Sequence, residues 1–235
     1  AALYFKLAKD SSSVSERLDI LGELARHYEQ AGLSAKKDGV AEEIKKIVSN
    51  NKKVKPTGNA AFYLAESSFK DIAKERKKYD AIKLRFPEND LIFLMKKKQK
   101  ALLKLVKTYD DEIEKGVPEW GVAALYEKST AYGAYVEQFR KLKIPGRYTP
   151  EERKDAETAL AQIDKTQIIP LEQNAVEIMN LCAERAAQFH VVNSYSQKCF
   201  DEAKKAKDKV SPFGIQPQAG FWSTRAPKDG ASKYE

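Results

Sequence analysis

Two histidines and two cysteines are the side chains of this sequence best suited to metal binding or nucleophilic chemistry. His27 and His190 lie far apart, and the sequence has no His-x-x-x-His or Cys-x-x-Cys pattern that would place two ligands on one zinc ion. It also has no glycine-rich phosphate loop and no Gly-x-Ser-x-Gly turn around a nucleophile. Asp and Glu are distributed as on helix surfaces, so we predict that the chain is not an enzyme and holds no metal or cofactor.

Cys182 and Cys199 flank an expected turn near Val191-Val192. Each lies a similar number of residues from that turn, so the two would reach similar heights on facing helices. A disulfide is possible if their Cα atoms come within about 7 Å. Two buried free thiols are the alternative, since unpaired cysteines are common in protein cores. A disulfide would favour an oxidising compartment.

The formal net charge is +8 and the pI is about 9.2. About 33 of the 42 basic residues are lysine, whereas arginine supplies the forked donors that bind phosphates and base edges. We therefore predict no nucleic-acid partner. The basic runs 74–78 and 96–100 are interpreted as solvated charge, with an acidic partner or a lipid headgroup as the alternative. No apolar run approaches the roughly 18 residues of a membrane span. The printed chain begins without Met and without a signal-peptide pattern, so we expect the natural chain to begin upstream.

The stretch 118–139 organises the rest of the chain. At helical spacing it carries two apolar stripes side by side, so it needs neighbouring helices on two sides. One stripe contains Val122, Leu125, Tyr132, Val136 and Phe139 and is interrupted by Ser129; the other contains Trp120, Ala124, Ala131 and Tyr135. Small residues should let the neighbours approach closely. These are Gly121, Ala123, Ala124, Gly133 and Ala134.

Helical periodicity extends over most of the remaining chain. We expect helices over about 1–9, 14–31, 34–48, 59–78, 96–115, 149–190 and 194–209. Thr149 and Glu152 predict a capping box, Asn59 and Ser194 are expected N-caps, and Pro170 should kink or split the helix that contains it.

Residues 79–95 interrupt this pattern. Ile82, Leu84 and Phe86 alternate with charged residues, which indicates a short β-hairpin. Extension of the flanking helices explains the same residues equally well.

Residues 211–235 are rich in Pro and Gly, which prevents a regular element. The segment also carries Phe213, Ile215, Phe221 and Trp222. These large apolar residues predict an extended tail that packs on the helices.

Three segments have a similar pattern of residues. Leu18, Leu21-Gly22 and Ala25 resemble the first-helix signature of a tetratricopeptide repeat (TPR). Ala61, Leu64-Ala65 and Ser68 repeat it, and Val122, Leu125-Tyr126 and Ser129 repeat it more weakly. The Leu-Gly equivalents are 43 and then 61 residues apart where the consensus period is about 34, so the repeats would carry insertions. The sequences at 116–126, 144–145 and 170–175 resemble large TPR-type proteins of the bacterial envelope.

This resemblance implies an all-α, TPR-like α-solenoid of antiparallel helix pairs. Residues 1–210 would form the repeat domain with an insertion at 79–95, and 211–235 the extended tail. The implied function is a non-enzymatic scaffold that binds a protein or peptide partner in a bacterial envelope complex, in the periplasm or at the outer membrane. The alternative is a nucleic-acid-binding α-solenoid that uses the Lys-rich surface.

In the repeat register, the first helix of each pair lines a concave groove suited to an extended peptide. Carried onto this sequence, that register places on the inner surface Asp19, Glu23, Arg26, His27, Asn59, Phe62, Glu66, Phe69, Lys70, Ala123, Glu127 and Thr130. Two alternatives remain open: Phe62 and Phe69 could be core residues, and Phe221-Trp222 could occupy the groove.

Overall fold

The computed structural model describes residues 2–209, and the regular secondary structure in that range is helical, without a strand. The predicted packing of the tail 211–235 lies outside the described residues. The elements are α1 (Ala2–Asp10), α2 (Val14–Gln30), α3 (Ser34–Asn50), α4 (Gly58–Asp80), α5 (Glu88–Ile113), α6 (Pro118–Arg140), α7 (Pro150–Ile163), the π-helical turn η1 (Asp164–Ile168), α8 (Ile169–Gln188) and α9 (Ser194–Lys209).

The helix ends follow local chemistry. The predicted capping box of α7 is confirmed: the Thr149 hydroxyl accepts from the Glu152 amide at 3.2 Å, and the Glu152 carboxylate accepts from the Thr149 amide at 2.7 Å. Asn193, rather than the predicted Ser194, caps α9, because its side-chain oxygen accepts the amides of Tyr195 and Ser196 at 2.9 Å. The cap predicted at Asn59 is also wrong, since α4 already begins at Gly58.

The β-hairpin interpretation of residues 79–95 is wrong. The helix α4 continues to Asp80 and α5 begins at Glu88, which leaves only the loop 81–87 between them. Leu91 and Met95, one helical turn apart, are both buried on α5. The alternation in the sequence was too short to outweigh this helical packing.

Pro170 does not break the helix that contains it. The chain passes from α7 into α8 through η1, where the Ile169 amide donates to the carbonyl of Asp164, five residues back. This shift of hydrogen-bond register directly precedes Pro170, which occupies the first turn of α8 and so needs no amide partner there.

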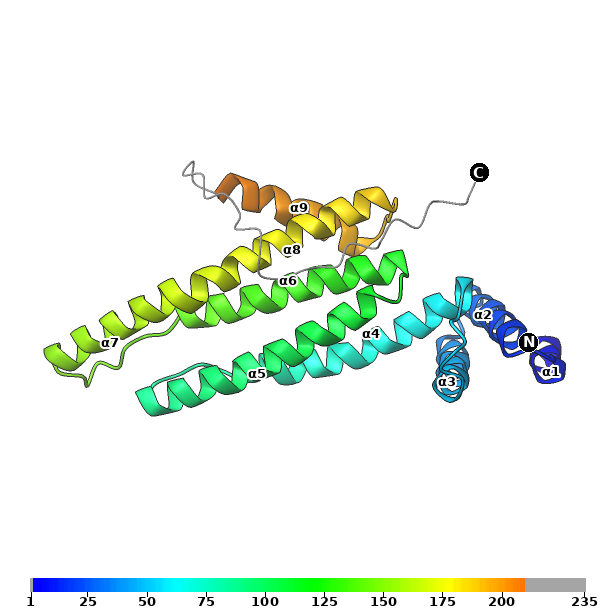
Figure 1. Cartoon of the computed structure of the whole chain (residues 1–235), viewed down its shortest axis with the longest axis horizontal. Coiled ribbons are helices and arrows are strands. Elements are labelled where there is room, and N and C mark those ends of the chain that lie inside the picture. The colour runs from blue at the N-terminus through cyan, green and yellow to red at the C-terminus, as the bar shows by residue number, and fades with distance from the viewer. Residues whose placement is uncertain (1, 210–235) are drawn as a thin grey trace.

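The helices bury three connected apolar cores. Figure 1 shows α4, α5, α6 and the long α7–α8 helix running side by side, with α9 on α8 and with α1 to α3 gathered at the beginning of α4. The first half of α4 packs in the core of α1 to α3, and its second half packs with α5 and α6. The third core joins α6 to α8 and α9. The stretch predicted to need neighbours on two sides, α6, therefore contacts α4, α5, α8 and α9.

Small residues allow close approach at some of the predicted positions. Ala123 and Ala124 are completely buried. The same prediction is wrong for Gly121 and Gly133, where an added Cβ would meet nothing within 4 Å. At position 22 only glycine fits without a shift of the backbone, because a Cβ there would lie 2.5 Å from the backbone nitrogen of Ala60. The absence of a side chain at Gly22 therefore allows the backbones of α2 and α4 to come into direct contact.

Candidate partner-binding groove

A groove of about 620 Å³ runs between α6 and α8 and reaches α9; we call it the α6–α8 groove. Five of its residues carry apolar or no side chains: Gly133, Val136, Ala175, Val176 and Met179. An added Cβ at Gly133 would meet no atom within 4 Å, so this position faces open space in the groove. Beside it, the Ser129 hydroxyl donates to the carbonyl of Ala175 at 2.7 Å. That bond explains why a polar residue interrupts the apolar stripe of α6.

The charged residues of the groove include both signs. The Arg140 guanidinium donates to the two carboxylate oxygens of Glu172 at 2.6 and 2.7 Å, which joins the end of α6 to the beginning of α8. This hydrogen bond raises the pKa of Arg140. Both side chains remain about 45% exposed, so they are accessible to a partner. Glu137 and Lys141 form a second pair beside them, and Tyr126 and Glu202 line the other part of the groove.

The residues predicted from α2 for the inner surface form side-chain contacts with neighbouring residues. Glu23 accepts from Arg26 at 2.9 Å and from the Asn59 amide group at 2.6 Å. These two bonds lower the pKa of Glu23. The imidazole of His27 lies 3.1 Å from the Tyr4 hydroxyl of α1, and Asp19 accepts from Thr57 at 3.3 Å.

The residues predicted from α4 divide between ion pairs and core. Glu66 accepts from the buried Lys37 at 2.7 Å, and Lys70 donates to Asp38 at 2.7 Å. Together these bonds hold α3 against α4. Phe69 is a core residue, as the alternative interpretation expected, and Phe62 is half-buried. Both rings contact Trp120, with centroid distances of 5.2 and 5.8 Å.

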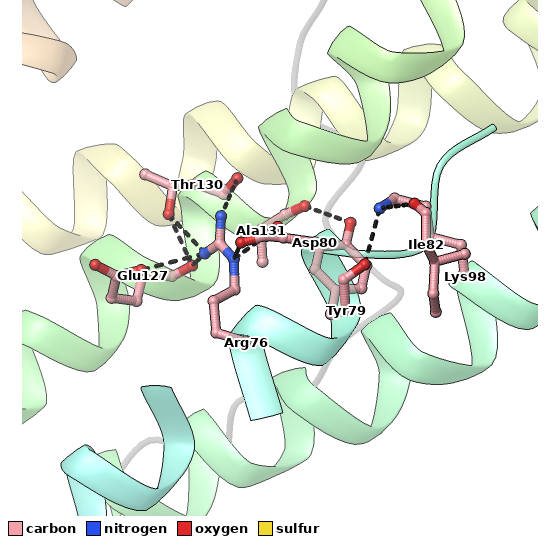
Figure 2. A network of polar contacts seen from close by, with 8 residues as sticks. All are labelled: Arg76, Tyr79, Asp80, Ile82, Lys98, Glu127, Thr130 and Ala131. Atoms are coloured by element: carbon pink, nitrogen blue, oxygen red, sulfur yellow. Dashed lines mark hydrogen bonds and ion pairs between the residues drawn. The ribbon is translucent and has the colours of Figure 1, made fainter. Parts of the chain in front are cut away.

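The residues predicted from α6 are held by one arginine (Figure 2). Arg76 of α4 donates to the Glu127 carbonyl at 3.0 Å, to the Glu127 carboxylate at 3.2 Å and to the Thr130 hydroxyl at 3.0 Å. It also donates to Asp80 on its own helix at 3.0 Å. Since Arg76 is mostly buried, these contacts hold the end of α4 against the middle of α6.

A second buried cation, Lys98, is bonded to the end of α4 (Figure 2). Lys98 of α5 has no exposed surface, and its ammonium donates to the carbonyls of Tyr79 and Ile82 at 3.2 and 2.9 Å. The same ammonium lies 4.0 Å from the centroid of the Tyr79 ring. Tyr79 in turn donates through its hydroxyl to the carbonyl of Ala131 at 2.8 Å. The end of α4 is therefore bonded to both α5 and α6.

Most of the polar residues predicted for the inner surface thus take part in contacts between helices. Thr130 alone among its predicted residues also lines the α6–α8 groove. Sequence reasoning missed the groove residues of α8, such as Ala175 and Met179, because small and apolar residues on a helix resemble core positions. Gly133, a glycine within a mainly apolar helix, is the sequence feature that could have indicated an open groove at this position.

Cys182 and Cys199 form a disulfide between α8 and α9, with their Cα atoms 5.7 Å apart. Both residues are completely buried. Among the described residues, no group of three or more His, Cys, Asp or Glu side chains is arranged to hold a metal ion. No helix in the same part of the chain is long and apolar enough to cross a membrane.

No protein-family model, curated protein or solved structure matches this chain.

Proposed function

We propose that this chain is a non-enzymatic scaffold that binds a peptide or protein segment in the α6–α8 groove. The groove itself is the observation that carries the proposal. Its volume of about 620 Å³ is within the range of ligand-binding clefts, and its apolar floor is bordered by charges of both signs. Apolar side chains of a partner would occupy the floor, and its polar groups would meet Arg140 and Glu172.

A TPR-like solenoid of antiparallel helix pairs is the architecture that we propose for this scaffold. Two features support it. Gly22 of the first signature-like segment rests on Ala60, just before the second segment, so a residue of the pattern lies at a helix contact. In addition, α2 contacts α4 and α4 contacts α6, so the three helices that carry the pattern are consecutive neighbours. A preformed, rigid stack reduces the ordering cost of binding.

We further propose that the scaffold works in an oxidising compartment, as part of a bacterial envelope complex in the periplasm or at the outer membrane. The disulfide between Cys182 and Cys199 supports this location, because such bonds persist outside the reducing cytosol. Acid quenching of cells that make the protein, followed by thiol alkylation and mass spectrometry, tests it. Oxidised cysteines are expected, and fully alkylated ones would contradict the proposed location.

A glycine substitution can block the groove without damaging the fold. Gly133→Leu places a side chain in open space, and replacing a mid-helix glycine should raise the free energy of unfolding by several tenths to about 1 kcal/mol. The measurement is the affinity of peptides selected from a displayed random library against the whole chain. We expect selected peptides to bind the Gly133→Leu variant at least about tenfold more weakly.

Gly121→Leu is the matched control, because it adds the same side chain to the same helix outside the groove. It should leave peptide affinity unchanged. Equal binding of the selected peptides to wild type and Gly133→Leu would place their site elsewhere and refute the groove as the binding site.

A further inference from the structure

The net charge of the chain is concentrated in one segment. Residues 74–107 contain twelve Lys and Arg against four Asp and Glu, so this segment alone accounts for the whole formal charge of +8. It comprises the end of α4, the loop 81–87 and most of α5. The rest of the chain is electrically balanced.

The helix α5 presents much of this charge on one exposed stripe. At helical spacing, Lys96, Lys97, Lys100, Lys104 and Lys107 lie on one side of the helix, and all five are exposed. From position 93 to position 107 the stripe is about 21 Å long. The opposite side of α5 carries the buried Leu91, Met95, Leu102 and Leu105, so the orientation of the stripe toward solvent is set by the core.

At the end of α4, Lys78 lies near this stripe, because it pairs with Glu75, the residue that also pairs with Lys104. Lys74, Lys77 and Lys78 are exposed, and α4 packs against α5. The ammonium of Lys104 lies 3.5 Å from the carboxylate of Glu75, which brings the two basic runs of the sequence together. We call the surface formed by 74–78 and the α5 stripe the basic face.

Large apolar side chains are exposed beside these lysines. Phe93 is 64% exposed, Leu103 is 53% exposed and Ile92 is 46% exposed. Phe93 and Leu103 belong to the same stripe as the lysines, one near each end. Exposed aromatic and aliphatic side chains among lysines are characteristic of helices that lie on a membrane surface.

We propose that the basic face binds an anionic lipid membrane surface. Lysines would attract the negative headgroups, and Phe93, Leu103 and Ile92 would enter the boundary between headgroups and acyl chains. Lysine suits this role because a diffuse negative surface needs charge without the forked geometry of arginine. Among the described residues, Lys97, Lys100 and Lys107 form no ion pair, so their charge is free to act on the membrane.

This proposal is independent of the partner-binding groove. The groove is lined by α6, α8 and α9, whereas the basic face is formed by α4 and α5. Figure 1 shows the pair α4 and α5 on one side of α6 and α9 on the other side. A membrane-bound chain would therefore keep its groove accessible.

Vesicle co-sedimentation of the whole chain tests the proposal. We expect binding to phosphatidylcholine vesicles that contain about 30 mol% phosphatidylglycerol, weakening as salt rises, and no binding to pure phosphatidylcholine. The triple variant Lys97→Glu, Lys100→Glu, Lys107→Glu should bind the anionic vesicles at least about 100-fold more weakly. Lys46→Glu, Lys52→Glu, Lys53→Glu is the control with the same change of charge on other exposed lysines, and it should retain most of the binding.

A second variant distinguishes a membrane from a nucleic acid. Phe93→Ser with Leu103→Ser should weaken vesicle binding about tenfold, because the apolar contacts are lost while the charge remains. Single-stranded and duplex oligonucleotides are measured at the same salt. Tighter binding to oligonucleotides than to anionic vesicles, equal loss in the control variant, or failure to bind anionic vesicles would each overturn the proposal. Circular dichroism checks that these surface variants remain folded.

Discussion

Two buried cations help to connect the middle helices of this protein. Lys98 and Arg76 both lie in basic runs that looked in the sequence like solvated charge. In the structure, both donate hydrogen bonds to backbone carbonyls and thereby offset part of the cost of their burial. Their neighbours Lys77 and Lys97 remain exposed. Which lysine or arginine of a run turns inward depends on its angular position relative to the core.

The buried Lys98 should make stability depend on pH. Burial lowers the pKa of Lys98 from 10.5 to about 8. Between about pH 8 and 10.5 the unfolded chain keeps a proton that the folded protein has released, so the free energy of unfolding rises with pH in that window. Relative to Lys98→Met, wild type should gain up to about 3 kcal/mol between pH 7 and pH 10.5 in urea denaturation.

The exposed neighbour provides the control. Lys97→Met removes the adjacent exposed lysine and so controls for the loss of one positive charge; the pH-dependent gain of wild type should be larger relative to Lys98→Met than relative to Lys97→Met. A stability difference between wild type and Lys98→Met that is the same at both pH values would contradict the lowered pKa.

At the level of helices, the contact between α2 and α4 depends on a single missing side chain. The backbone nitrogen of Ala60 lies only 2.5 Å from the position that a Cβ at residue 22 would occupy, and backbone cannot move aside as a flexible side chain can. Gly39 in α3 has nothing within 4 Å of its Cβ position and is exposed. The two glycines therefore have opposite structural roles.

Substituting these two glycines should change stability in opposite directions. Gly22→Ala should lower the free energy of unfolding by about 1 to 2 kcal/mol, since overpacking outweighs the gain in helix propensity. Gly39→Ala should raise it by up to about 1 kcal/mol, because only the propensity changes. Urea denaturation of both variants measures the difference. Equal stabilisation by the two substitutions would show that α2 and α4 do not approach this closely.

Most elements were predictable at this scale. The helix of α6, the capping box of α7 and the helical periodicity of α2, α3 and α4 depend on residues close together in the chain. The sequence of 79–95 is ambiguous because a short alternating run carries little information. Its outcome was decided by Leu91 and Met95, which pack in the core shared by α4, α5 and α6.

In the whole molecule, two connections hold the outer parts to the central helices. The helix α4 belongs to two apolar cores and so joins α1 to α3 with α5 and α6. At the other side, α9 is attached to α8 by the disulfide and by the core around Met179 and Cys182. The attachment of α9 is covalent and apolar, whereas ion pairs between α3 and α4 add to the apolar core at the other connection.

Reduction of the disulfide should lower global stability. Its cysteines are separated by 17 positions, and closing a loop of this size is worth about 3 kcal/mol. Urea denaturation with and without reductant measures the change in the free energy of unfolding. The double variant Cys182→Ala, Cys199→Ala should not respond to reductant. A wild type that is fully reduced by mass spectrometry yet equally stable would contradict this expectation.

The sequence by itself determined where helices form and where several of them begin, because periodicity and capping are properties of neighbouring residues. Tertiary structure decided which charged residues are buried, where Gly22 must remain glycine, and which face of α6 is left open as a groove. These outcomes depend on contacts between residues far apart in the chain. Glu127 and Thr130, predicted to face a partner, accept hydrogen bonds from Arg76 of another helix, and no local sequence pattern predicts that contact.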